Sequence, residues 1–138
     1  MKKKFKAMVL SCVDPRFQPL VYNHLKKKKL TGKYSAFTIA GSAIGVTHKK
    51  FKKWHSTFIE NLSASIKLHK IEKLIVFNHT DCGAAKIVNR NDKFNSLIEE
   101  DIHRLSFIEI KKKIKKKFPK IKIDLNLISL DKKIKKFN

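Results

Sequence analysis

The feature that most constrains the fold is a regular alternation between short apolar runs and longer amphipathic segments. Four apolar runs have the length of β-strands: residues 6–10, 34–39, 73–78 and 121–130. Three segments between them carry apolar side chains at helical spacing: residues 20–29, 49–70 and 96–117. This order predicts an α/β protein with a mostly parallel, open β-sheet of about four strands and helices on both faces.

The length of the chain and its cysteines limit the class of protein further. A chain of 138 residues suffices for one hydrophobic core but not for two, so we expect a single domain over residues 1–138. No apolar stretch approaches the roughly 20 residues that a membrane-spanning helix needs. The two cysteines, Cys12 and Cys82, are too few for a disulfide framework, which favours a cytoplasmic protein with reduced thiols.

The net charge of +22 comes almost entirely from lysine, because all but three of the 33 basic residues are lysines. Sequence-specific reading of bases relies on Arg, Asn and Gln presented together on one element, and no such element is visible. The lysine runs instead spread along the whole chain. They predict a solvated basic surface with weak, sequence-independent attraction to polyanions, and no specific nucleic-acid partner.

Two short polar segments follow predicted strands and contain both cysteines. Residues 11–16 read S-C-V-D-P-R, and residues 79–83 read H-T-D-C-G. In an open parallel sheet, the segments beyond the carboxyl ends of the strands converge on the ligand crevice. Two thiolates and an imidazole form a zinc ligand set of the catalytic kind, with a fourth position open for water. Cys12, His79 and Cys82 are therefore the predicted ligands of Zn²⁺.

Asp14 and Arg16 are placed to assist such a metal. Asp14 lies two residues beyond Cys12, and Arg16 can clamp the Asp14 carboxylate in a bidentate pair. Because two thiolates cancel the formal charge of zinc, a nearby group must help to hold and orient hydroxide. A zinc-bound hydroxide oriented by Asp14 suits attack on a small electrophilic carbon at near-neutral pH.

A turn of small residues at positions 40–45 follows the second predicted strand and is expected near the same crevice. It does not match G-x-G-x-x-G, so it does not favour nucleotide binding. We assign Gly41 and Ser42 of this turn, and Gly83 beside Cys82, to the substrate pocket. The remaining histidines are interpreted as surface or packing residues: His24, His48, His55, His69 and His103.

The pattern C-x-D-x-R followed by H-x-x-C-G resembles the β-class carbonic anhydrases over about residues 7–86. The resemblance implies an α/β fold that assembles as dimers or multiples of dimers. It also implies that Cys12, His79 and Cys82 bind zinc and that Asp14 and Arg16 form the catalytic pair. In some members the equivalent aspartate binds zinc and closes the site, so Asp14 is also a candidate fourth ligand.

Several positions depart from the pattern of that family. Pro15 stands where a small residue, typically serine, is usual, and residues 38–41 read T-I-A-G in place of the usual R-N-A-G. The chain starts at its first predicted strand. The resemblance is therefore to a compact member without the N-terminal helical arm that usually wraps the partner subunit.

The leading hypothesis is an enzyme, a carbonate dehydratase that reversibly hydrates CO2 to bicarbonate as a homodimer or larger assembly. A related zinc hydrolase acting on carbon disulfide or carbonyl sulfide uses the same chemistry. Two alternatives from other classes are a catalytically weak zinc protein with a regulatory role and a basic nucleic-acid-associated protein that keeps the fold. Metal content separates the last from the others, and CO2 hydration separates the enzyme from the weak zinc protein.

Overall fold

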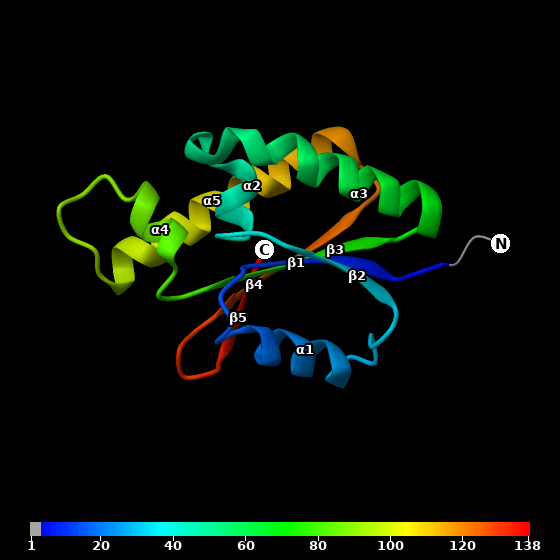
Figure 1. Ribbon diagram of the computed structural model, residues 1–138, viewed down its shortest axis with the longest axis horizontal. Helices are drawn as coiled ribbons and strands as arrows, with labels where there is room; N and C mark the ends of the chain where they lie inside the picture. The colour runs from blue at the N-terminus through cyan, green and yellow to red at the C-terminus, as the bar shows by residue number, and fades with distance from the viewer. Residues whose placement is uncertain (1–3) are drawn as a thin grey trace.

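The computed structural model describes residues 4–138 and shows a β-sheet between two layers of helices (Figure 1). Five strands form the sheet: β1 Ala7–Ser11, β2 Tyr34–Thr38, β3 Lys73–His79, β4 Lys122–Ile128 and β5 Ile134–Phe137. Their order is β2-β1-β3-β4-β5, with the first four strands parallel and β5 antiparallel to β4. The predicted mostly parallel sheet is confirmed, with one strand more than the four expected.

Helices cover both faces of this sheet, as predicted. The helical elements are α1 Gln18–Lys27, α2 Ala43–Thr47, the 3₁₀ helix η1 Lys49–Trp54, α3 His55–His69, α4 Gly83–Val88 and α5 Ser96–Lys117. Helix α1 lies on one face, and α2, α3 and α5 lie on the other (Figure 1). Helix α4 follows the carboxyl end of β3, beyond the sheet (Figure 1).

The two central strands, β1 and β3, are buried on both faces. Leu10 and Val76 belong to the apolar cluster that includes residues of α3 and α5, whereas Val9 and Ile75 belong to the cluster beneath α1. Burial on both faces explains why these strands are continuous apolar runs rather than alternating ones. It also fixes their register, which pairs Ser11 of β1 with Phe77 of β3. The segments that follow β1 and β3 therefore start side by side.

The fourth apolar run does not form one strand. Strand β4 ends at Ile128, the chain turns at residues 129–133, and β5 returns beside β4. Leu130, predicted as a strand residue, lies in this turn with 58% of its surface exposed. The turn contains no Gly or Pro. It is held by hydrogen bonds from the Ser129 hydroxyl to Asp131 and to the Lys133 carbonyl, and Lys132 takes a positive φ of 69°.

The three predicted helices are present but differ in detail, and α1 begins and ends two residues before its predicted bounds. The helix expected over residues 49–70 begins as η1, because Phe51 has non-helical angles, and continues as α3. Helix α5 matches its predicted bounds, but its buried face is offset from the apolar positions on which the prediction rested: Ile98, Ile102, Leu105, Ile108 and Ile114. Leu105 and Ile108 are 62% and 46% exposed, whereas Glu99 and His103 are buried. The reason is a polar network at the candidate site, described below.

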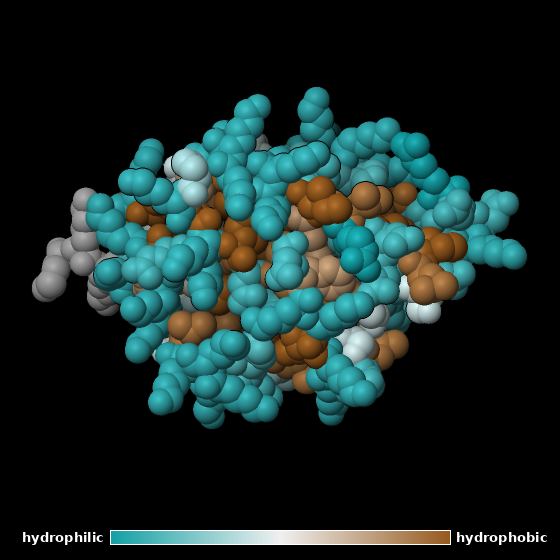
Figure 2. Space-filling model, turned by 180° about the vertical axis from the view of Figure 1, so that it is seen from behind, coloured by the Kyte–Doolittle hydropathy of each residue, from teal (hydrophilic) through white to brown (hydrophobic). Residues whose placement is uncertain are grey.

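The lysines form a solvated surface, as predicted. All lysines that the structure describes are exposed except Lys111 and Lys113, which are half-buried. Figure 2 shows hydrophilic residues over most of one face, with hydrophobic residues visible between them. Within residues 4–138, no helix is both long and apolar enough to cross a membrane.

Candidate metal centre and active site

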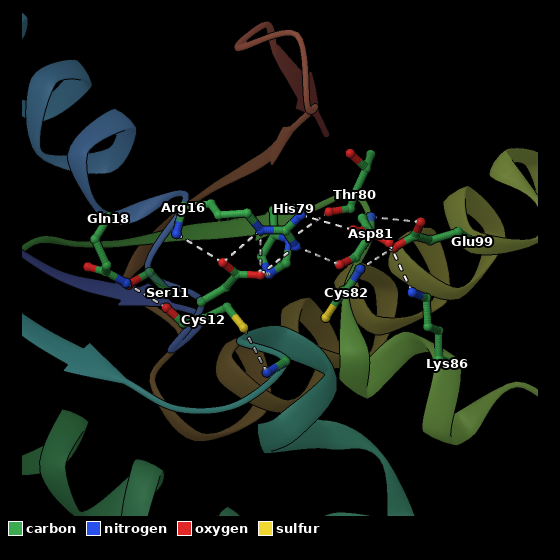
Figure 3. Close-up of polar contacts among 12 residues, drawn as sticks. Ser11, Cys12, Arg16, Gln18, His79, Thr80, Asp81, Cys82, Lys86 and Glu99 are labelled. Atoms are coloured by element: carbon green, nitrogen blue, oxygen red, sulfur yellow. Dashed lines mark hydrogen bonds and ion pairs between the residues drawn. The ribbon is translucent and has the colours of Figure 1, made fainter.

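Three potential metal ligands meet at the carboxyl ends of the two central strands. Cys12 directly follows β1, His79 is the last residue of β3, and Cys82 immediately precedes α4. One ligand atom from each lies within 4.8 Å of the others, and all three residues are buried (Figure 3). The structure thus brings together the two segments that the sequence singled out. None of the other histidines that the structure describes joins a group of three such ligands.

The imidazole of His79 is oriented for coordination. Its Nδ1 donates a hydrogen bond of 2.7 Å to the Thr80 carbonyl oxygen, so the proton lies on Nδ1 and the lone pair on Nε2. Phe17 stacks on the ring at a centroid distance of 4.1 Å. Nε2 is buried and has no hydrogen-bond partner among residues 4–138. A buried nitrogen without a partner, facing two thiols, fits a metal ligand.

The two cysteines polarise each other. Interaction with the Cys82 side chain, and to a smaller extent with the nearby His79 imidazole, lowers the pKa of the Cys12 thiol to about 4, although burial opposes this shift. The Gly41 amide also donates to Cys12 Sγ at 3.3 Å. The same Cys12–Cys82 contact, together with burial, raises the pKa of Cys82. The lowered pKa of Cys12 favours its thiolate, and a bound cation would favour ionisation of the Cys82 thiol as well.

Asp14 and Arg16 form the predicted bidentate pair. Arg16 Nη2 donates to Asp14 Oδ2 at 2.7 Å, and Arg16 Nε donates to both carboxylate oxygens at 3.1 and 3.3 Å (Figure 3). These bonds lower the pKa of Asp14 to about 2, so its carboxylate is ionised. Its Oδ2 lies 3.9 Å from His79 Nε2, which is too far for a hydrogen bond. The carboxylate is thus held at the edge of the cluster.

Asp81 joins the two motifs, a role that the sequence analysis did not anticipate. Its carboxylate accepts from Arg16 Nη1 at 2.9 Å and from Lys86 Nζ at 3.0 Å. Arg16 Nη2 also donates to the Asp81 carbonyl at 3.2 Å. Bonds from Lys86 and then Arg16 lower the pKa of Asp81. Arg16 therefore contacts carboxylates from both motifs, which fixes its guanidinium beside Asp14.

Glu99 on α5 anchors the loop that carries Cys82. Its buried carboxylate accepts from the amides of Asp81 and Cys82, each at 2.9 Å, and from His103 Nε2 at 3.1 Å. His103 Nδ1 in turn contacts the Asn78 side-chain amide at 2.9 Å. The network links the end of β3, the Cys82 loop and α5 through fully or partly buried hydrogen bonds. It fixes the backbone from which the Cys82 side chain projects (Figure 3).

This network was missed because it depends on a contact between distant segments. His103 was expected at the surface or in packing, and it is a fully buried packing residue with hydrogen bonds on both ring nitrogens. A sequence signal did exist. Glu99 and His103 lie four residues apart and share the helix face of Phe107, Ile110 and Ile114, all of them buried. Two polar residues in phase with a buried stripe indicate a paired polar cluster.

A hollow of about 430 Å³ opens over the cluster. Its lining includes the potential ligands Cys12 and His79, the Asp14–Arg16 pair, and Gly41 and Gly83. Gly41 has a positive φ of 79°, and a Cβ there would come within 2.6 Å of Ala84 Cβ. Ser42 does not line the hollow. Its hydroxyl is fully buried and donates to the Leu10 carbonyl, so the structure places it in the support of the turn.

A second hollow of about 530 Å³ lies between α2, the segment after α4, and α5. Although it is larger, none of the three potential ligands lines it, nor do Asp14 and Arg16. The strongly lowered pKa values of Cys12 and Asp14 belong to side chains that line the smaller hollow instead. We therefore place the candidate active site there.

The fold and this site define an α/β protein with a candidate metal centre at the carboxyl ends of a parallel sheet. The chain belongs to the family described as "Putative carbonic anhydrase", whose model matches residues 1–128. An uncharacterized protein of Rickettsia conorii is 26% identical over 125 residues, which cover 90% of this chain and 67% of that protein.

Solved structures share the fold at low sequence identity. One comes from a study of two tetrameric β-carbonic anhydrases of Sordaria macrospora, with a TM-score of 0.62 and 8% identity over 99% of this chain and 82% of the other. The structure of a carbon disulfide hydrolase matches with a TM-score of 0.55 and 17% identity. The matched region covers 100% of this chain and 81% of the hydrolase chain. At these identities the likeness shows a common fold.

Proposed function

We propose that this protein is a zinc-dependent carbonate dehydratase that reversibly hydrates CO2 to bicarbonate. The observation that carries the proposal is the buried Cys12–His79–Cys82 cluster with an unpartnered His79 Nε2, next to an ionised carboxylate and an open hollow. Membership of the carbonic anhydrase family supports the same reaction.

Zn²⁺ suits these three ligands because it accepts thiolate sulfur and imidazole nitrogen together and takes four ligands. When bound, the metal would lower the pKa of a coordinated water and so supply a nucleophile near neutral pH. The chain contributes the orientation of the ligands. The Thr80 carbonyl directs His79, the Gly41 amide contacts Cys12, and Glu99 holds the Cys82 backbone.

Asp14 is proposed as the catalytic residue that accepts a hydrogen bond in the hollow and orients water there. Its low pKa keeps it an acceptor throughout the neutral range. Arg16 engages both of its oxygens, and this pairing competes with coordination of a metal by Asp14. We therefore favour the role of Asp14 beside the metal over its role as a fourth ligand.

The hollow suits a small, neutral, linear substrate. Apolar side chains of Val13, Pro15, Ala40 and Ala84 line it together with the polar groups. CO2 has this size and polarity, and so do carbon disulfide and carbonyl sulfide. Hydrolysis of these sulfur compounds is the second candidate, since the same walls accept them and the fold is shared with a carbon disulfide hydrolase.

We also propose that residues 1–138 act as one zinc domain, in the cytoplasm, as a homodimer. Both cysteines are free thiols, which suits a reducing compartment. Strand β2 lies at one edge of the sheet with half-buried and exposed side chains, and such an edge favours pairing with another chain.

Stopped-flow measurement of CO2 hydration by the zinc-loaded protein tests this proposal, with Cys82→Ser as the metal-deficient control. We expect acidification above the buffer rate for the parent and none for the variant. Release of sulfide from carbon disulfide without CO2 hydration would favour the second candidate. Neither activity in a fully zinc-loaded protein would contradict both and leave a catalytically weak zinc protein.

A further inference from the structure

A third hollow, of about 330 Å³, lies at the amino ends of the strands, at the edge of the sheet opposite to the candidate metal centre. The starts of β1, β3 and β4 line it together with the loop between α1 and β2. Six lysines surround it: Lys6, Lys28, Lys29, Lys33, Lys73 and Lys122. We call it the lysine hollow.

None of the six lysines around this hollow has a carboxylate partner within residues 4–138, although they face one concave surface. Elsewhere Lys86 pairs with Asp81, and Lys135 pairs with Glu100. Among residues 4–138, Glu72 is the only carboxylate that lines the lysine hollow, and it pairs with Lys4 at 3.6 Å. The hollow therefore concentrates positive charge that the described chain does not neutralise.

The backbone beneath these lysines is fixed in place. The Lys6 amide donates to the Lys33 carbonyl at 2.7 Å, the Glu72 amide to the Lys6 carbonyl at 3.1 Å, and the Lys122 amide to the Glu72 carbonyl at 3.0 Å. These bonds join the four segments of the rim. The side chains thus project from a rigid base around an apolar floor.

Helix geometry explains only part of this arrangement. Lys28 and Lys29 follow the carboxyl end of α1, where positive charge is favourable. Lys6, Lys73 and Lys122 lie instead at the starts of strands, which carry little net dipole. Like charges gathered around one hollow repel one another, and a bound anion would remove that repulsion.

We propose that the lysine hollow binds an oligophosphate group, such as a triphosphate chain, either free or as part of a nucleotide. Six separate ammonium groups match an anion with several closely spaced negative charges better than an anion with one charged group. Lysine presents point charges rather than the planar fork of arginine, which favours phosphate chains over the bidentate capture of one carboxylate. A volume of about 330 Å³ suits a small ligand rather than a long polymer.

Isothermal titration with tripolyphosphate, ATP and inorganic phosphate at constant ionic strength tests this proposal. The test variant combines Lys28→Gln, Lys33→Gln and Lys73→Gln. The control variant removes the same charge from exposed lysines of η1 and α5, away from the hollow: Lys53→Gln, Lys115→Gln and Lys116→Gln. Circular dichroism confirms that both variants fold.

We expect tripolyphosphate to bind the parent and the control variant within about 2-fold of each other, and the test variant on the order of 10-fold more weakly. Inorganic phosphate should bind much more weakly than tripolyphosphate. Tighter binding of ATP than of tripolyphosphate would identify a nucleotide as the source of the phosphates.

Equal weakening in both variants would contradict the proposal, because binding would then depend only on net charge. Absence of tripolyphosphate binding by the parent would contradict it too. So would affinity for RNA that grows with strand length and exceeds that for tripolyphosphate. Zinc content should be the same in both variants and the parent, since the lysine hollow lies away from the metal centre, so this result is independent of the proposed activity.

Discussion

Replacing Glu99 should weaken both the fold and the metal centre, because one buried carboxylate holds three donors. Its oxygens accept from the amides of Asp81 and Cys82 at 2.9 Å and from His103 Nε2 at 3.1 Å, and only 6% of the residue is exposed. A buried donor that loses its partner costs about 1–3 kcal/mol. For Glu99→Ala we therefore expect a loss of about 3–5 kcal/mol, allowing for water reaching the partly buried Asp81 amide.

Glu99→Gln removes the negative charge of the side chain but keeps one oxygen that can accept a hydrogen bond. The amide keeps one oxygen but replaces the other with a donor, so about half of the effect, about 1–3 kcal/mol, should remain. Urea unfolding of the metal-free proteins measures the free energies, and Glu109→Gln, at an exposed position of the same helix, is the matched control. Competition with a zinc chelator should show weaker zinc binding in both Glu99 variants and parent-like binding in the control.

The pH dependence of stability provides a further check on Glu99. Burial raises the pKa of its carboxyl, but contacts with His103 and with the two amides outweigh burial and keep the pKa below its ordinary 4.5. A carboxyl with a lower pKa in the folded state stabilises at neutral pH and loses this contribution as the pH falls. The difference between parent and Glu99→Gln should therefore shrink below pH 4.5. Unfolding free energies within 0.5 kcal/mol of the parent for both Glu99 variants, about the scatter of surface substitutions, would refute the reasoning.

Three other substitutions, one of them with a control at Gly83, test the site. Asp14→Asn should retain zinc but slow CO2 hydration by on the order of 10²-fold, and unchanged stopped-flow rates would show that Asp14 has only a structural role. Gly41→Ala should destabilise by about 1–3 kcal/mol in urea unfolding, because its φ is positive and its Cβ would meet Ala84, whereas Gly83→Ala meets nothing within 4 Å and should be near neutral. Cys82→Ser should remove zinc, as elemental analysis would show, and should abolish the stabilisation that zinc adds to the parent in thermal unfolding; full zinc retention would exclude Cys82 as a ligand.

The sequence predicted the parts of the fold that local patterns determine. The buried strands β1 and β3 were recognisable because strands covered on both faces are continuous apolar runs. Strand β5 was not, because its sequence, I-K-K-F, exposes two lysines at a sheet edge and follows a turn without Gly or Pro. Lysines on an edge strand hinder further pairing and also hide the strand from a hydrophobic pattern.

The candidate site also has features that the local sequence predicted and one that it did not. Cys12, Asp14 and Arg16 lie within one short segment, and His79 and Cys82 within another, so their proximity followed from the ends of two neighbouring strands. The anchoring of Cys82 by α5 depends on how a helix packs against a loop 17 residues away in sequence. No local spacing specifies that contact.

X-ray absorption at the zinc edge of the purified, reduced protein tests the central claim most directly. The account predicts one zinc per chain, with two sulfur ligands at about 2.3 Å and nitrogen or oxygen ligands, imidazole among them, at about 2.0–2.1 Å. The Cys82→Ser variant should lack this signal. A site with only oxygen and nitrogen ligands, or a reduced protein that binds no zinc when zinc is supplied, would contradict the assignment of Cys12, His79 and Cys82 as the metal centre.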